Sequence, residues 1–215
     1  MLEIGAGLGA LTLPLAERAG RVVAIERDTA LAAALAWVLR GHGLHLALPS
    51  DAPRRDVSQA NASRRDRARR VWVIAADALH LPFESLDRLV TAGCSGAEAG
   101  GRLSGRCLVA GNLPYGITSP VLLWLVSESG WERAVIMVQR EVADRMTAEP
   151  ATEAYGSLTV AVAARCSVRR LFDVSRRCFF PAPEVDSTVL ALEPLSRRPD
   201  RELSRALEAV LGAAF

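Results

Sequence analysis

The first twenty residues place a short apolar run, three alternating glycines and a helical segment in direct succession. Residues 1–4 read as a strand, Gly5, Gly7 and Gly9 follow at once, and residues 10–19 have helical character. A glycine turn between a strand and a helix lets the backbone approach a ligand closely. The spacing is G-x-G-x-G, whereas the dinucleotide fingerprint is G-x-G-x-x-G, so an NAD-dependent oxidoreductase is the weakest interpretation.

The same alternation of strand and helix continues along the chain. Further strands are expected at 22–25, 71–75, 107–110, 134–138, 168–174 and 187–192, and further helices at 29–40, 120–127, from about 141, at 155–165 and at 201–215. Strands that alternate with helices imply an α/β fold with a parallel sheet covered on both faces.

Two stretches, residues 41–70 and 91–105, interrupt this rhythm. Both are rich in small and polar residues, and we expect surface insertions rather than domain boundaries. The first ends in an arginine run, with seven arginines and three aspartates between Asp51 and Arg70. A solvated loop is the plain interpretation of this run, and contact with RNA phosphate is the alternative.

The composition excludes several classes of protein. Apolar residues make up 50% and charged residues 23%, which is typical of a globular chain. All 26 basic residues are arginine, which excludes a P-loop lysine and a Schiff-base lysine. The isolated cysteines form no C-x-x-C pair, so we expect no zinc site and a reducing cytoplasm. No apolar run reaches the roughly 18 residues of a membrane span, and no signal peptide is visible.

Three carboxylates stand at the ends of three expected strands. Glu3 precedes the glycine turn, Glu26 ends the second strand and Asp77 follows the third. In an open α/β sheet these ends line the ligand crevice, where Glu26 can accept hydrogen bonds from both ribose hydroxyls and Asp77 can meet an adenine amino group. A helix cap is the competing interpretation for Asp77 taken alone.

The tetrapeptide Asn112-Leu113-Pro114-Tyr115 ends the fourth expected strand. An exocyclic base amine is a weak nucleophile because its lone pair is delocalised into the ring. Hydrogen bonds to the Asn112 side-chain oxygen and to a backbone carbonyl near Leu113 or Pro114 would favour a pyramidal nitrogen, and Tyr115 could stack on the base. The alternative is an Asx turn followed by a core tyrosine.

Near the end of the chain, Phe179 and Phe180 precede a proline-stiffened loop that leads into the last strand through Asp186 and Ser187. One phenylalanine is expected to close the other face of the base pocket and the other to pack in the core. The spacing favours Phe179 for the pocket.

Taken together, these motifs resemble one family. They are LEIGAGLGALT (2–12), AIERD (24–28), AADAL (75–79), GNLPYGITSPVL (111–122), MVQREVADRM (137–146), YGSLTVAV (155–162) and FFPAPEVDSTV (179–189). The chain resembles the rRNA adenine N6,N6-dimethyltransferases, and among them the bacterial small-subunit, kasugamycin-resistance type. The resemblance covers nearly the whole chain apart from the two insertions, and NLPY with FxPxPxVDS is its most specific part.

The resemblance implies a Rossmann-like class I methyltransferase with a mostly parallel seven-stranded sheet. It divides the chain into a catalytic domain, 1–195, and the beginning of a helical RNA-binding domain, 196–215. The cofactor would be S-adenosylmethionine, with no metal. Cofactor-binding residues would be Glu3, Gly5, Gly7, Glu26, Arg27, Asp77, Ala78 and Asn112, and catalytic residues Asn112, Leu113, Pro114, Tyr115 and Phe179.

The implied substrate is a pair of adjacent adenosines near the 3′ end of small-subunit rRNA, in the immature small ribosomal subunit. The protein would act as a monomer in the cytoplasm and would not bind a membrane. One alternative is the macrolide-resistance type that methylates large-subunit rRNA, against which Leu113, Thr118-Ser119-Pro120 and Asp186 argue. Another is a ribosome-assembly checkpoint factor with little catalysis, and a third is a non-functional remnant.

The sequence also departs from the family pattern at both ends. Members carry a glutamine-asparagine-phenylalanine motif before the first strand and a complete helical domain after the last. We therefore expect a fragment, or an open reading frame assigned from the wrong start, with weaker cofactor binding and weaker RNA affinity than a complete member.

Overall fold

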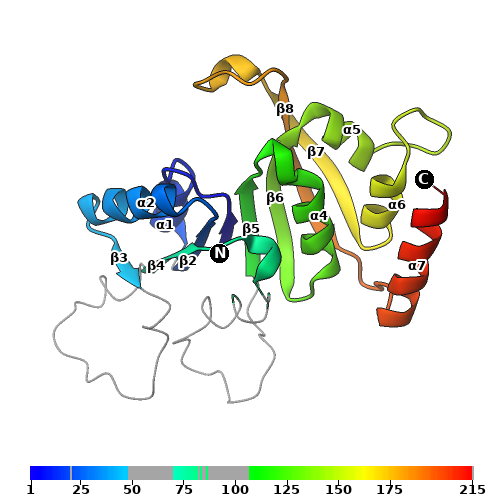
Figure 1. Cartoon of the computed structure of the whole chain (residues 1–215), viewed down its shortest axis with the longest axis horizontal. Coiled ribbons are helices and arrows are strands. Elements are labelled where there is room, and N and C mark those ends of the chain that lie inside the picture. The colour runs from blue at the N-terminus through cyan, green and yellow to red at the C-terminus, as the bar shows by residue number, and fades with distance from the viewer. Residues whose placement is uncertain (20, 48–69, 82, 84–85, 87–106, 215) are drawn as a thin grey trace. The chain divides into compact units, whose positions relative to one another are not determined.

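The computed structural model describes residues 1–19, 21–47, 70–81, 83, 86 and 107–214. The chain forms two compact units, Met1–Gly111 and Asn112–Phe215, and the boundary falls inside strand β5 (Figure 1). Each unit is described by itself below.

The first unit holds five parallel strands in the order β3-β4-β2-β1-β5. Their bounds are β1 Leu2–Ile4, β2 Arg21–Glu26, β3 His45–Ala47, β4 Arg70–Ala75 and β5 Cys107–Asn112. The register pairs Ile4 with both Ile25 and Gly111, and Glu26 with Ala75. The carboxyl ends of these strands therefore meet at one edge, which is where ligands bind in open parallel sheets.

Helices α1 (Thr12–Arg18) and α2 (Thr29–Gly41) contribute to one apolar cluster on this sheet. Ala16 of α1 and Leu35 and Leu39 of α2 share that cluster with Val22 and Val71. Asp28 caps α2, because its Oδ1 accepts hydrogen bonds from the amides of residues 30 and 31 at 2.8 and 3.0 Å. A short 3₁₀ helix, η2 (Ala78–His80), follows β4.

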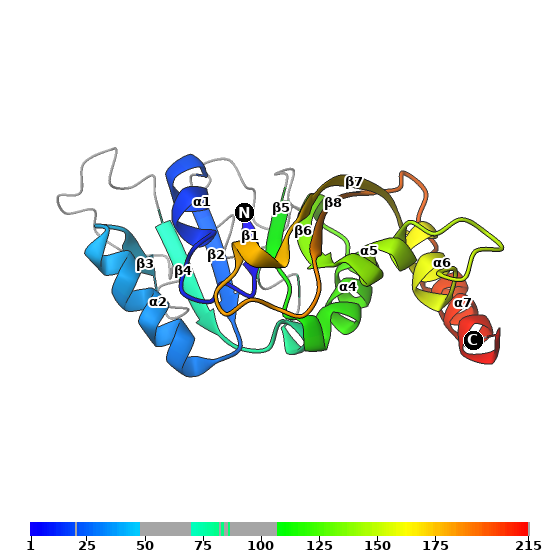
Figure 2. The ribbon, with the colours of Figure 1, turned by 90° about the horizontal axis from the view of Figure 1, so that it is seen from above.

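The second unit is built on three antiparallel strands in the order β6-β8-β7. Their bounds are β6 Trp131–Gln139, β7 Cys166–Val174 and β8 Ser187–Pro194; the helices are η3 Tyr115–Ile117, α4 Thr118–Ser127, α5 Arg140–Met146, α6 Ser157–Ala163, η4 Arg176–Cys178 and α7 Arg201–Ala214. Figure 2 shows α4 and α5 on the same side of β6 and β8. Fully buried aliphatic side chains from α4, β6 and β8 form the core: Leu122, Leu125, Ile136, Leu190 and Leu192.

The expected α/β fold and its order of elements are confirmed, with two differences. The three-residue strand β3 lies inside the segment 41–70 that was expected to be an insertion, and it adds a strand to the seven predicted. The last strands are antiparallel because only the short 3₁₀ helix η4 lies between β7 and β8, and a parallel connection needs a longer crossover. Residues 48–69 and 91–105, the remainder of the two expected insertions, lie outside the described residues. In the part of the chain described, no helix has the length and apolar character needed to cross a membrane.

Candidate cofactor and target-base sites

The glycine turn after β1 is shaped by its backbone. Gly5, Gly7 and Gly9 have φ values of 76°, 54° and 92°, a region that favours glycine. The amides of residues 5 and 6 both donate to the Ile25 carbonyl, at 2.9 and 3.1 Å, which holds the turn against the end of β2. A Cβ on Gly9 would lie 2.6 Å from Leu35 Cδ1, so the buried Leu35 side chain of α2 would have to shift to admit any other residue at this position.

Glu26 connects the glycine turn to the end of β2. Its Oε2 accepts a hydrogen bond from the Gly7 amide at 2.8 Å, and its Oε1 accepts one from the Asp28 amide at 2.9 Å. The residue is only 9% exposed. Each carboxylate oxygen has a second lone pair, so Glu26 can hold the turn and still accept hydrogen bonds from the two hydroxyls of a ribose.

Glu3 is a buried carboxyl with a strongly perturbed pKa. It is 1% exposed, and this burial raises its pKa to about 7, with the Thr12 hydroxyl opposing the rise and the nearby Glu26 adding to it. Among the described residues, Glu3 Oε2 and Thr12 Oγ1 have no hydrogen-bond partner of normal geometry. A buried polar atom without a protein partner is a feature of functional sites, because a ligand or water has to satisfy it.

The other predicted cofactor residues of this unit differ in their surroundings. Asp77 caps η2, with its Oδ1 accepting from the Leu79 amide at 3.0 Å. The helix-cap interpretation is thus correct for one oxygen, while Oδ2 lies 3.8 Å from His80 Nδ1 and keeps free lone pairs. Ala78 is buried in the first turn of η2, whereas Arg27 is exposed after β2.

In the second unit, the tetrapeptide 112–115 alternates between anchoring and exposed residues. Leu113 is 1% exposed and its amide donates to the Met137 carbonyl at 3.1 Å. Asn112 and Pro114 are exposed, and no hydrogen bond joins the Asn112 side chain to another described residue. The Asx-turn alternative therefore does not apply, and the Asn112 amide is left available to a ligand.

Tyr115 is partly buried, and its hydroxyl lies 2.9 Å from Ser187 Oγ at the start of β8. Pro114 is held on its carbonyl side, because this oxygen accepts hydrogen bonds from Thr118 Oγ1 at 3.0 Å and from the Ile117 amide at 3.1 Å. The Tyr115 ring thus belongs to neither the apolar core nor an unrestrained surface loop.

The segment between β7 and β8 carries the two phenylalanines. Phe179 directly follows η4 and is partly buried, whereas Phe180 is fully exposed. The expectation that one of the two rings packs in the core is wrong, because the segment extends beyond the ends of β7 and β8 (Figure 1) and supplies no apolar environment for Phe180.

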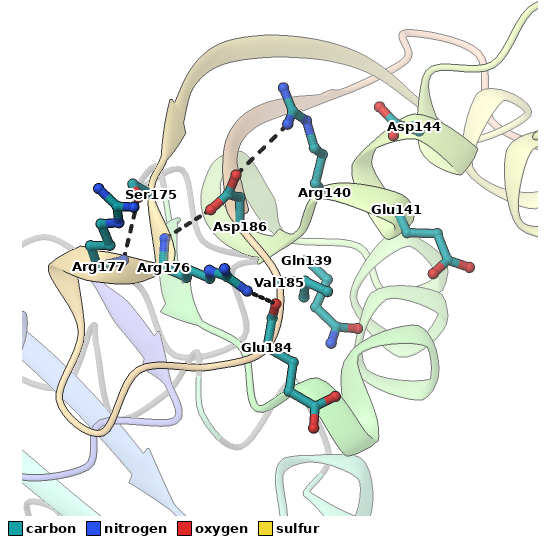
Figure 3. Close-up of a pocket in the computed structure, with 10 residues that line it drawn as sticks. All are labelled: Gln139, Arg140, Glu141, Asp144, Ser175, Arg176, Arg177, Glu184, Val185 and Asp186. Carbon is teal, nitrogen blue, oxygen red and sulfur yellow. Dashed lines mark hydrogen bonds and ion pairs between the residues drawn. The ribbon is translucent and has the colours of Figure 1, made fainter.

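Asp186 fastens both ends of this segment. Its Oδ1 accepts a hydrogen bond from the Arg176 amide at 3.0 Å, and its Oδ2 lies 3.8 Å from Arg140 Nη1. Arg176 Nη1 in turn donates to the Glu184 carbonyl at 2.8 Å. Figure 3 shows these interactions around a cavity of about 620 Å³ that is lined by charged side chains of α5 and of the segment.

Three residues that shape these sites were not among the predicted site residues: Gly9, Arg140 and Ser187. Gly9 completes the G-x-G-x-G spacing, and Ser187 ends the quoted motif FxPxPxVDS, so the motif itself was the available signal. The contacts of Arg140 and Ser187 with residues far along the chain are visible only in the fold. Within the described ranges, no group of three or more His, Cys, Asp or Glu residues is placed to hold a metal ion.

Comparison with known proteins decides the family. A model of the ribosomal RNA adenine dimethylase family matches residues 1–215. The chain belongs to this family. Relatives named ribosomal RNA small subunit methyltransferase A include one from Pelotomaculum thermopropionicum, 41% identical over 90% of this chain, and one from Moorella thermoacetica, 42% identical over 89%. The alignment covers 56% of each of these two relatives, so the chain spans little more than half of their length.

Two solved methyltransferase structures have a similar fold. A dimethyladenosine transferase from Plasmodium falciparum aligns with a TM-score of 0.63 at 26% identity, covering 90% of this chain and 55% of its own. The 23S rRNA methyltransferase ErmE aligns with a TM-score of 0.62 at 26% identity, covering 97% of this chain and 67% of its own. The fold is therefore that of the Rossmann-like methyltransferases.

Proposed function

We propose that this chain transfers methyl groups from S-adenosylmethionine to N6 of two adjacent adenosines near the 3′ end of small-subunit rRNA, giving N6,N6-dimethyladenosine. The observation that carries the proposal is the exposed Asn112 side-chain amide, which has no hydrogen-bond partner among the described residues and lies in a tetrapeptide whose neighbours are anchored. Family membership and the name of the relatives that are 41% and 42% identical, ribosomal RNA small subunit methyltransferase A, support the substrate.

The residues of the first unit fit the proposed cofactor. S-adenosylmethionine supplies an electrophilic methyl group on a sulfonium, and it carries a ribose and an adenine. Glu26 would accept hydrogen bonds from the ribose hydroxyls, while Asp77 and Ala78 would bind the adenine. Gly5 and Gly7 give the close backbone approach, and the unpartnered Glu3 oxygen fits a polar group of the ligand or a water bound beside it. Arg27 would contribute from the surface.

The tetrapeptide would orient the target amine. Asn112 Oδ1 would accept one hydrogen bond from the adenine amino group. Both lone pairs of the Pro114 carbonyl already have donors, in Thr118 and Ile117, so the backbone acceptor would be the Leu113 carbonyl. These two acceptors favour a pyramidal nitrogen whose lone pair is free to attack, and the proton is lost to water after transfer. Catalysis then depends on placement and fixed dipoles.

Tyr115 and Phe179 would stack on the base after it leaves its helical stack. Base–aromatic stacking contributes about 1 to 3 kcal/mol per base, enough to offset much of the unstacking. The substrate would be the immature small ribosomal subunit in the cytoplasm. The protein would act on it as a monomer and would bind no metal. Residues 196–215 would form the beginning of a helical domain that binds rRNA.

A second candidate is methylation of large-subunit rRNA, which the structural likeness to the 23S rRNA methyltransferase ErmE favours. The two candidates are separated by offering labelled S-adenosylmethionine with unmethylated small subunits and, separately, with large subunits. Label in small-subunit rRNA is the expected result. Label confined to large-subunit rRNA would replace the proposal with the second candidate.

A further inference from the structure

The motif FxPxPxVDS ends in two polar residues, and neither has a role in the proposed chemistry. Ser187 is 0% exposed, and Asp186 immediately precedes it at the start of β8. β8 is the middle strand of its unit, and Ser187 pairs with Gln139 of β6 on one side and Val174 of β7 on the other. The dipeptide therefore lies where hydrogen bonding to neighbouring strands restrains the backbone.

Ser187 contacts the first aromatic residue of the proposed base pocket. Its Oγ lies 2.9 Å from the Tyr115 hydroxyl, across 72 positions of sequence. A tyrosine ring rotates about two side-chain bonds, and a hydrogen bond at its far end removes much of that freedom. Because the serine is buried between two strands, the bond fixes the ring relative to the sheet.

Asp186 restrains the segment that carries the second aromatic residue. Its side chain accepts from the Arg176 amide at the beginning of η4, three residues before Phe179. Its backbone carbonyl accepts from the Arg140 amide at 3.0 Å, and the Arg140 side chain pairs with its carboxylate (Figure 3). The position of η4 is thereby tied to the first turn of α5.

We propose that Asp186 and Ser187 form the positioning element of the target-base pocket, with Ser187 orienting Tyr115 and Asp186 placing the segment that carries Phe179. This inference rests on the proposed function for the identity of the base. Neither residue is expected to touch the adenine, so both are positioning residues rather than catalytic ones.

The first experiment measures the hydrogen bond without relying on catalysis. The chain has two tyrosines, so a Tyr155→Phe background with carbon-13-labelled tyrosine reports Tyr115 alone by NMR. Ser187→Ala should shift and broaden the Tyr115 ring signal. Ser127→Ala is the matched control, because it removes a serine hydrogen bond of 2.8 Å to the Trp124 carbonyl on α4. A ring signal that Ser187→Ala leaves unchanged would overturn the inference.

The second experiment is a double-mutant cycle on single-turnover methyl transfer. Ser187→Ala and Tyr115→Phe each remove one partner of the same bond, and each should slow transfer about threefold to tenfold with the dissociation constant for S-adenosylmethionine within twofold of wild type. The double variant should be no slower than the singles. Losses that multiply would contradict a shared role.

Asp186 is tested by two substitutions that differ in what they keep. Asp186→Asn retains an oxygen that can accept from the Arg176 amide but loses the charge facing Arg140, whereas Asp186→Ala loses both. Transfer should fall more in Asp186→Ala, and Asp186→Asn should recover most of the difference. Equal losses would contradict the placing role of the amide bond. A wild-type chain that methylates no rRNA would instead refute the proposed function, and the Tyr115 ring signal would still decide the orienting role of Ser187.

Discussion

The two candidate sites hold their polar groups in opposite ways. In the first unit the carboxyls of Glu3 and Glu26 are buried, and Glu26 accepts hydrogen bonds from two backbone amides. In the second unit the Asn112 amide is exposed, and the restraint comes from buried neighbours such as Leu113 and Ser187.

This difference matches the two ligands proposed. A small cofactor can be bound by a turn whose backbone and carboxylates are already in place. An adenosine that leaves its stack in RNA can be bound only by groups that are accessible to it. The orientation of those exposed groups then has to be fixed by buried residues that contact them. We therefore expect substitutions in the first unit to change stability and cofactor affinity, and substitutions at the exposed groups of the second to change transfer alone.

The largest effect is expected from Asn112→Ala. The substitution removes the side-chain acceptor for the target amine, and loss of one such preorganised group slows the chemical step by roughly 100- to 1,000-fold. Single-turnover transfer measures the rate, and titration with S-adenosylmethionine should show nearly unchanged affinity. Retained activity would remove Asn112 from the mechanism and break the comparison.

Gly9→Ala should destabilise the first unit. The new Cβ would lie 2.6 Å from Leu35 Cδ1 at a φ of 92°, and overpacking with backbone strain of this kind costs about 2 to 4 kcal/mol. Gly41→Ala is the control, since Gly41 ends α2 with open space around it and should gain up to about 1 kcal/mol. Urea unfolding of both variants checks the pair; equal stabilities would show that α2 yields to the methyl group.

Glu3→Gln should change the pH dependence of stability. The pKa of Glu3 rises from 4.5 to about 7 in the folded protein. Between these values the unfolded chain has lost the proton and the folded protein keeps it, so the Glu3 contribution to stability falls as pH rises through this window. The free energy of unfolding of Glu3→Gln minus that of wild type should grow by up to about 3 kcal/mol from pH 4.5 to pH 8.

The control for this series is Glu17→Gln, at an exposed glutamate on α1. Denaturant unfolding across the pH range gives both curves. A Glu3→Gln difference that stays constant with pH would mean that the buried carboxyl keeps an ordinary pKa.

The smallest effect is expected from Arg27→Ala. Arg27 is exposed, so its interactions with a bound cofactor are screened by water, and affinity for S-adenosylmethionine should fall by less than about threefold. A tenfold loss of affinity for S-adenosylmethionine, measured by calorimetric titration, would show that Arg27 contacts the bound cofactor directly. It would also weaken the contrast between buried and exposed groups.

Particular residues show how far the sequence alone could go. The position of Glu26 at the carboxyl end of β2 was predictable because an apolar run that ends in an acid indicates a buried parallel strand, and the structure adds that Glu26 accepts a hydrogen bond from the Gly7 amide. The strand and helix order was predictable for the same reason, since apolar periodicity and turn residues are local signals. Asp77 caps η2 with one carboxylate oxygen, as its position before a helix predicts, and its contact with adenine through the other oxygen stays a prediction.

Features set by distant contacts were not predictable. Ser187 meets Tyr115 across 72 positions, and no local pattern encodes that pairing. General hydrophobicity predicts that one of the two phenylalanines packs in the core, but the exposure of Phe180 depends on how far the segment before β8 extends. Strand β3 is not predictable from the sequence because it has only three residues beside a stretch rich in turn residues.

The most direct test of the account uses one preparation of unmethylated small ribosomal subunits, treated with wild type or with Asn112→Ala and digested for nucleoside mass spectrometry. The account predicts N6,N6-dimethyladenosine from wild type and none from Asn112→Ala, with both proteins binding S-adenosylmethionine equally. Wild type that binds S-adenosylmethionine but leaves adenosine unmodified, or equal product from Asn112→Ala, would contradict it.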